Sequence, residues 1–217
     1  MIQATEYEKP ANAERIFAKI VSYIFHPLFL PSFIFLWLRV RFPFEFPGIT
    51  PKVLFEKTFS VIWITAFFPA FSVFLLWRLK FISNIFLRTA KERIAPYIIT
   101  MIFYWWMWYL SRYFTDQPEI LKAFYFGIFV ATVFGLILNN FMKISMHAMG
   151  VGGILTFVII TCFYYQVYLG LDMAVTTIVT GLVCSCRLAL SEHSKGEIYL
   201  GLFVGIFCQL IGYWIAM

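Results

Sequence analysis

The sequence predicts an all-α membrane protein, a polytopic transmembrane bundle of six or seven helices. Hydrophobic residues make up 62% of the 217 residues and charged residues only 13%, against roughly 25% charged in an average soluble domain. The chain also contains several runs near 20 residues without Asp, Glu, Lys or Arg, and a helix of that length crosses the ~30 Å hydrocarbon layer. These runs lack the alternation of barrel strands, and a helix satisfies its own backbone in lipid.

The uncharged runs follow one another along most of the chain. The run at 173–186 is short and has to continue past Arg187 to span the membrane, which is why the count is six or seven. Pro27 and Pro31 in the first run indicate a kink or a re-entrant hairpin. The runs are residues 20–38, 58–77, 94–111, 123–142, 144–171, 173–186 and 198–217.

The N-terminal residues 1–19 carry both acidic and basic side chains and lack the pattern of a cleavable signal peptide. We expect an interfacial segment there, followed by one transmembrane domain at residues 20–217. The net charge of +6 suits contact with anionic lipid or phosphate. No basic run interleaved with aromatics lies in a soluble segment, so the sequence argues against nucleic acid. The expected location is a membrane, the inner membrane if the source is bacterial.

The sequence predicts neither a metal site nor a cofactor. All four cysteines lie inside apolar runs, where cysteine behaves as a small hydrophobe. The three histidines, His26, His147 and His193, belong to three separate segments without the spacing of metal ligands.

Polar side chains concentrate in three connections between the apolar runs. Two membrane crossings separate each connection from the next, so all three emerge on the same face if every run spans. We therefore expect one site there. Its candidate residues are Arg88, Lys91, Arg93, Ser145, His147, Arg187, His193 and Glu197.

These residue types suit phosphate chemistry. Arg and Lys side chains bind phosphate oxygens through strong charge-assisted hydrogen bonds. A neutral imidazole can attack phosphorus while a protonated imidazole gives a proton to the leaving alkoxide. If the chain is helical from Leu188 onward, His193 and Glu197 share a helix face, and the carboxylate can orient the imidazole. Glu192 and Lys195 then fall on other faces and are expected to be solvated.

The last connection resembles the third motif of the type-2 phosphatidic acid phosphatase superfamily, S-R-x-x-x-x-x-H-x-x-x-D. Arg187, His193 and Glu197 match its three polar positions in spacing. Cys186 stands in place of the serine, and Glu197 is one methylene longer than the aspartate. This motif is the most specific part of a resemblance that covers residues 58–217.

Two further segments are similar to the other motifs of that family, but more loosely. Residues 145–148, SMHA, resemble the second motif P-S-G-H, with a methionine in place of the glycine. Residues 93–96, RIAP, resemble the end of the first motif, K-x-x-x-x-x-x-R-P. Phe86 occupies the position of its lysine, so Arg88 or Lys91 has to supply that cation.

The resemblance implies a helical membrane enzyme that removes phosphate from lipid phosphates or pyrophosphates without a metal. It implies that His193 is the nucleophile, through a phosphohistidine, that His147 is the general acid and that Glu197 orients the nucleophile. Arg93, Arg187 and Ser145 would then hold the phosphate, with Arg88 and Lys91 as further candidates.

Three alternatives stay open on the sequence. The substrate can be phosphatidate, phosphatidylglycerol phosphate or a polyprenyl pyrophosphate, and the oligomeric state is open. The loose first and second motifs also suit a catalytically inactive phosphatase-like protein that binds or carries an anionic lipid. A transporter or channel is disfavoured, because its charges are expected at mid-membrane rather than at one face.

Overall fold

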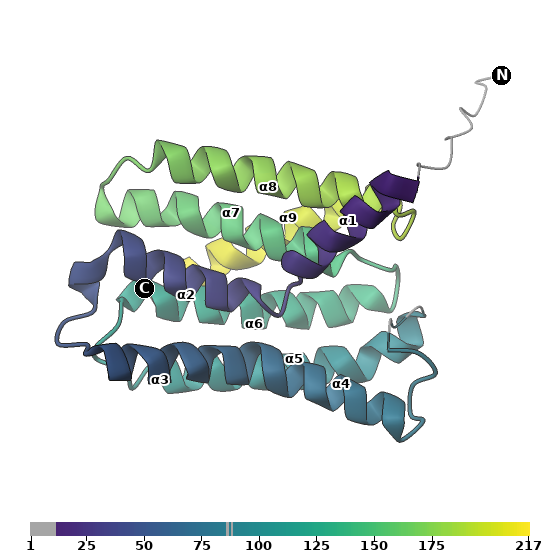
Figure 1. The fold of residues 1–217 in the computed structure, drawn as a ribbon, viewed down its shortest axis with the longest axis horizontal. Coiled ribbons are helices and arrows are strands. Elements are labelled where there is room, and N and C mark those ends of the chain that lie inside the picture. The colour runs from purple at the N-terminus through teal and green to yellow at the C-terminus, as the bar shows by residue number, and fades with distance from the viewer. Residues whose placement is uncertain (1–11, 86, 88) are drawn as a thin grey trace.

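The computed structural model describes residues 12–85, 87 and 89–217, which form a bundle of helices joined by short connections (Figure 1). No strand occurs in this described part of the chain, so the all-α class is confirmed. The elements are α1 (Asn12–Ile24), α2 (Leu30–Arg41), η1 (Pro43–Glu45), α3 (Pro51–Ile62), η2 (Trp63–Phe67), α4 (Phe68–Arg78), α5 (Ala90–Ser111), α6 (Glu119–Asn139), α7 (Met146–Tyr165), α8 (Gly170–Ala189) and α9 (Lys195–Ala216).

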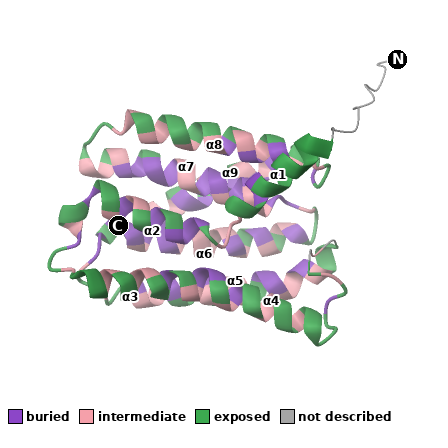
Figure 2. Cartoon of the chain, in the orientation of Figure 1, coloured by how far each residue is buried: buried purple, intermediate pink, exposed green. Residues whose placement is uncertain are grey.

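The described chain has the helices of a membrane protein. Five are long and apolar enough to cross a bilayer, namely the continuous helix Pro51–Arg78 and helices α6, α7, α8 and α9. Each has 20 to 28 residues, and 20 residues rise about 30 Å. Their outward faces are exposed (Figure 2) and carry large apolar side chains such as Phe163, Ile178 and Trp214. Exposed side chains of this kind suit contact with lipid rather than water.

The first apolar run does not form one continuous helix. It divides between α1 and α2, and the turn between them contains Pro27. Helix α2 has 12 residues, about 18 Å at 1.5 Å per residue, which is too short to span. Helix α1 packs against α8 and exposes Ile16, Phe17 and Ile20. The expected N-terminal segment at 1–19 thus continues as helix to Ile24, and residues 1–11 lie outside the described part.

Helices α7 and α9 approach each other closely through small residues. A Cβ at Gly205 would lie 2.0 Å from the carbonyl oxygen of Met149 and 2.9 Å from the backbone nitrogen of Gly153. A Cβ at Gly152 would lie 2.7 Å from the carbonyl oxygen of Leu202. Small residues allow membrane helices to pack backbone against backbone. This packing fixes the start of α7 beside the start of α9.

The connections α4–α5, α6–α7 and α8–α9 meet at one end of the bundle, at the right in Figure 1. Hydrogen bonds join them there. The side chain of Asn139 donates to the carbonyl oxygen of Ala90 at 2.7 Å, and the backbone N–H of Ser145 donates to the carbonyl oxygen of Glu197 at 3.3 Å. The three polar segments of the sequence therefore lie together.

We predict that Gly205→Ala destabilises the protein by about 2 kcal/mol, because the new methyl group meets backbone atoms that cannot move aside. The measurement is the thermal unfolding midpoint in detergent. The matched control is Gly181→Ala in α8, where a Cβ meets nothing within 4 Å and helix propensity favours alanine. Equal midpoints for the two variants would contradict this account of the α7–α9 contact.

Candidate functional site

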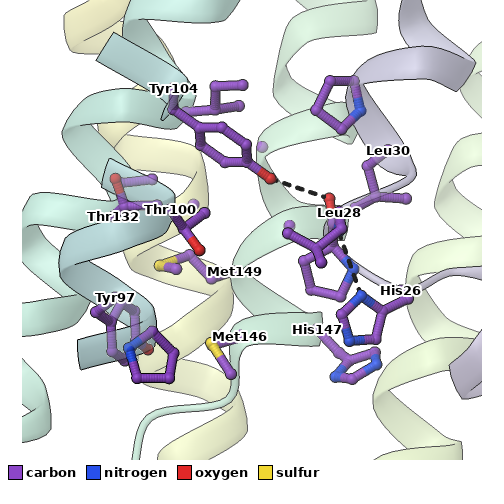
Figure 3. Close-up of a pocket in the computed structure, with 18 of the residues that line it drawn as sticks. His26, Leu28, Leu30, Tyr97, Thr100, Tyr104, Thr132, Met146, His147 and Met149 are labelled. Atoms are coloured by element: carbon purple, nitrogen blue, oxygen red, sulfur yellow. Dashed lines mark hydrogen bonds between the residues drawn. The ribbon is translucent and has the colours of Figure 1, made fainter. Parts of the chain in front are cut away.

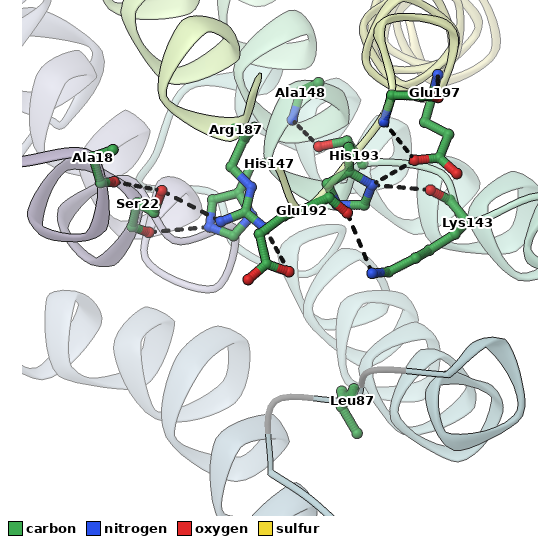
Figure 4. Close-up of polar contacts among 12 residues, drawn as sticks. Ala18, Ser22, Leu87, Lys143, His147, Ala148, Arg187, Glu192, His193 and Glu197 are labelled. Carbon is green, nitrogen blue, oxygen red and sulfur yellow. Dashed lines mark hydrogen bonds and ion pairs between the residues drawn. The ribbon is translucent and has the colours of Figure 1, made fainter. Parts of the chain in front are cut away.

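His193 lies in the α8–α9 connection and is 7% exposed. Its Nδ1 atom lies 3.0 Å from the carbonyl oxygen of Lys143 and 3.2 Å from Oε2 of Glu197 (Figure 4). A carbonyl and a carboxylate oxygen only accept hydrogen bonds, so Nδ1 carries the proton. The lone pair of the neutral ring is therefore on Nε2, the nitrogen that is free to react.

The charge of His193 follows from its surroundings. Burial, and then the nearby cations of Arg187 and Arg93, lower the pKa of His193 to about 4, although the hydrogen bond to Glu197 acts in the opposite direction. The imidazole is therefore neutral near pH 7. A neutral imidazole among cations has the protonation state that a nucleophile requires.

The contact between His193 and Glu197 arises differently from the sequence expectation. The condition of a continuous helix from Leu188 is not met, because α8 ends at Ala189 and α9 begins at Lys195, so the stretch is the end of one helix and the start of the next. Ser194 and Glu197 form a capping box. The Ser194 hydroxyl accepts from the Glu197 N–H at 3.3 Å, and Glu197 Oε2 accepts from the Ser194 N–H at 2.9 Å. The cap turns the carboxylate back past the start of the helix toward His193, the residue before the N-cap Ser194.

Arg187, in the last turn of α8, points into the same region with few partners. Its Nη1 donates to the hydroxyl of Ser22 at 3.4 Å, and its Nη2 lies 3.9 Å from Oε2 of Glu192. Its Nε atom is buried and has no hydrogen-bond partner. Glu192, which the sequence assigns to solvent, has a half-exposed side chain beside this arginine. The guanidinium thus has unused capacity to bind an anion.

Arg93 and Lys143 add two more cations. Arg93, near the start of α5, is 5% exposed, and it donates to the carbonyl oxygens of Leu87 at 3.0 Å and Ile144 at 3.3 Å. Lys143 donates to the carbonyl oxygen of Glu192 at 3.3 Å. Burial and the charge of Arg93 lower the pKa of Lys143. These backbone contacts orient the two cations without neutralising them.

Ser145 and His147 lie at the start of α7. The hydroxyl of Ser145 is buried and accepts from the N–H of Ala148 at 3.4 Å, which makes Ser145 the N-cap of the helix. The Nε2 atom of His147 donates to the carbonyl oxygen of Ser22 at 3.0 Å. The ring of His147 also meets the ring of His26 edge to face, with 5.4 Å between centroids. The first helix thus reaches the site, although it contributes no motif.

The structure brings together most of the candidate residues. We call Arg93, Lys143, His147, Arg187, His193 and Glu197 the polar cluster. Lys91 is exposed on α5 and takes no part in the hydrogen bonds or ion pairs described for this cluster. Arg88 lies outside the described residues.

A cavity of about 280 Å³ lies inside the bundle, beside Arg93 and His147 of the polar cluster (Figure 3). Arg93, His26 and His147 line its polar end, and apolar and small side chains from α4, α5, α6, α7 and α9 line the rest. Its lining includes Gln209, which is 1% exposed and has an amide nitrogen without a hydrogen-bond partner. The largely apolar lining suits an apolar chain.

No group of three or more His, Cys, Asp or Glu side chains that could hold a metal ion occurs among the described residues. The four cysteines are free thiols. The donor set of the polar cluster, three cations with two imidazoles, is suited to an anion rather than a metal ion.

Sequence reasoning missed three residues of this region, namely Ser22, His26 and Lys143. Lys143 was visible as a charge in the α6–α7 connection, but its carbonyl group, which fixes the tautomer of His193, leaves no side-chain signal. Ser22 and His26 belong to the first apolar run, and only the fold brings them to His147. His26 beside Pro27 is an unusual pair in an apolar run, which is the one signal that could have identified it.

Comparison with known protein families, with curated proteins and with solved structures finds no match for this chain. The geometry itself defines the class. The chain is a helical membrane protein in which a cluster of cations and histidines lies beside an apolar cavity.

Proposed function

We propose that the protein is a metal-independent lipid phosphate phosphatase that works through a phosphohistidine. The observation that carries the proposal is the tautomer and the neutral charge of the His193 ring. Its Nδ1 proton is held by Lys143 and Glu197, so that Nε2 presents a lone pair within the field of Arg93 and Arg187. A nucleophile with an orienting carboxylate, placed beside cations such as Arg187 that have an unused donor, is the arrangement that phosphoryl transfer requires.

Arg187, Arg93 and Lys143 bind the phosphate in this mechanism. The buried, unpartnered Nε of Arg187 and its long contacts to Ser22 and Glu192 favour an oxyanion as the missing partner. Charge-assisted hydrogen bonds from guanidinium groups to phosphate are among the strongest in proteins. The cations also stabilise the charge on the equatorial oxygens in the transition state.

Chemistry then proceeds in two steps. In the first, Nε2 of His193 forms a bond to phosphorus while the bond from phosphorus to the leaving oxygen breaks, and His147 gives that oxygen a proton that it takes up when the anionic substrate binds beside it. Glu197 stabilises the positive charge that develops on the His193 ring. In the second, neutral His147 takes a proton from water, whose oxygen attacks phosphorus and releases His193 and inorganic phosphate. Each group ends in its starting state.

The substrate in this proposal is an amphiphile. Its phosphate or pyrophosphate lies in the polar cluster, and its apolar chain enters the cavity of about 280 Å³. A site at one end of a membrane bundle is within reach of a headgroup at the surface of the bilayer. We propose that α5, whose 22 residues equal the length of a span, is a sixth crossing beside the five helices named above, and that α2 enters only part of the bilayer.

A second candidate function is binding or carriage of an anionic lipid without turnover. Two observations favour it. The hydroxyl of Ser145 is committed to the helix cap, and Nε2 of His147 is committed to Ser22. Binding without chemistry needs the cations and the cavity, but neither histidine. The first prediction below separates the two functions.

We predict that purified protein releases phosphate from lipid phosphates in excess chelator, and that His193→Asn lowers the rate by at least about 1000-fold, because the nucleophile is lost. The control is Asn140→Ala in the α6–α7 connection, where the exposed Asn140 side chain bonds only within its own helix. Lipid-phosphate binding without release by either form would favour the carrier. Full activity of His193→Asn would contradict the mechanism.

We also predict that Ala131→Phe lowers turnover of long-chain lipid phosphates by about tenfold and leaves a water-soluble aryl phosphate within about twofold. Ala131 lines the cavity on α6, so the larger side chain takes the space of the lipid tail, whose binding energy contributes to catalysis. The matched control is Ala174→Phe on the exposed face of α8. An equal loss for both substrates would contradict the assignment of the cavity to the tail.

A further inference from the structure

The end of α1 and the turn after it contact His147 from two directions. The carbonyl oxygen of Ser22 accepts from Nε2 of His147 at 3.0 Å, in the region where Arg187 also reaches the Ser22 hydroxyl. The ring of His26 meets the ring of His147 at an interplanar angle of 86°, and Figure 3 shows the two rings against each other at the polar end of the cavity. The His147 ring is therefore contacted both at Nε2 and by the ring of His26.

The contact with Ser22 decides which nitrogen of His147 can act. A carbonyl oxygen accepts and does not donate, so Nε2 keeps its proton in both charge states of the ring. The proton that His147 gives to a leaving oxygen must then come from Nδ1. After the transfer the ring is neutral, and the hydrogen bond from Nε2 to Ser22 is unchanged. The ring can thus gain and lose one proton without reorienting.

His26 is itself fixed by its neighbours. Its Nδ1 accepts from the N–H of Leu28 at 3.4 Å, so the proton of the neutral ring is on Nε2. Burial, and then the charge of Arg187, lower the pKa of His26 to about 4, which keeps the ring uncharged near pH 7. The turn is attached to α5, because the hydroxyl of Tyr104 donates to the carbonyl oxygen of Pro27 at 3.5 Å. A neutral ring, in a turn that is tied to α5, thus lies against the ring of His147.

We propose that Ser22 and His26 are positioning residues for His147, and that the α1–α2 segment is a fourth part of the site, absent from the three motifs. The proposal rests on the proposed function, because it concerns the donation of a proton to the leaving oxygen. Ser22 selects the nitrogen that donates the proton, and His26 prevents the ring from tilting away from the leaving oxygen.

The dependence of the rate on the leaving group distinguishes a positioning role of His26 from a role in packing alone. An alkoxide leaving group needs a proton in the transition state, whereas a nitrophenolate leaves well without one. Misplacement of the general acid therefore slows alkyl phosphates selectively. A general loss of structure slows both kinds of substrate in proportion.

The experiment measures kcat and KM of the full chain in detergent with an alkyl lipid phosphate and with p-nitrophenyl phosphate. For His26→Ala we expect kcat to fall by about tenfold or more on the alkyl substrate and by less than about twofold on the aryl substrate. His26→Phe retains a ring against His147 and is expected to recover most of the alkyl rate. Tyr23→Ala, an exposed position of α1, is the matched control with wild-type values on both substrates.

Ser22→Ala provides a separate comparison, since it keeps the carbonyl group and removes only the hydroxyl that Arg187 contacts. We expect a higher KM on both substrates and an unchanged ratio of alkyl to aryl kcat. Equal losses on both substrates for His26→Ala, or no loss on either, would overturn the positioning role. A wild-type protein that releases phosphate from neither substrate would overturn the proposed function instead, so the two failures are distinguishable.

Discussion

The candidate site depends on one interaction, the hydrogen bonding of Nδ1 of His193 to the carbonyl oxygen of Lys143 and the carboxylate of Glu197. This interaction fixes the tautomer and the orientation of the ring, while burial and the charges of Arg187 and Arg93 keep the ring neutral. It also joins the α6–α7 connection to the start of α9. Without it, His193 would be one more polar residue in a loop at the membrane boundary.

The packing of the bundle makes this interaction possible. Helices α7 and α9 touch backbone to backbone at Gly205 and Gly152, so the residues that precede the two helices are neighbours. The N–H of Ser145 can then donate to the carbonyl of Glu197. The glycines after the second motif-like segment thus serve helix packing, and by doing so they determine the geometry of the polar end.

Much of this architecture could be predicted from the sequence, because lipid imposes simple rules on length and polarity. The uncharged runs gave the helical class, and the alternation of crossings placed Arg93, His147 and His193 at one end. The division of the first run into α1 and α2 was harder, since prolines permit a break without requiring one. Ser194 and Glu197 have the spacing of a capping box in the sequence, which is the signal for a helix that begins after Ser194.

Contacts that distant segments make through their backbone atoms could not be predicted from the sequence. The carbonyl groups of Ser22 and Lys143 orient both histidines, yet a carbonyl group is present in every residue and carries no sequence signal. The use of Ser145 as a helix cap rather than a free hydroxyl is likewise a matter of local backbone geometry. The role of a polar residue in a membrane bundle thus depends on which neighbours have already used its donors and acceptors.

In the proposed mechanism, Nε2 of His193 becomes bonded to phosphorus. A brief reaction of the protein with a lipid phosphate carrying a radioactive phosphate group, followed by denaturation and analysis of the chain, detects that bond. We expect label on His193 that survives alkali and is lost in acid, as a phosphorus–nitrogen bond requires, and no label on His193→Asn. Label that survives acid, or equal labelling of the two proteins, would contradict the mechanism.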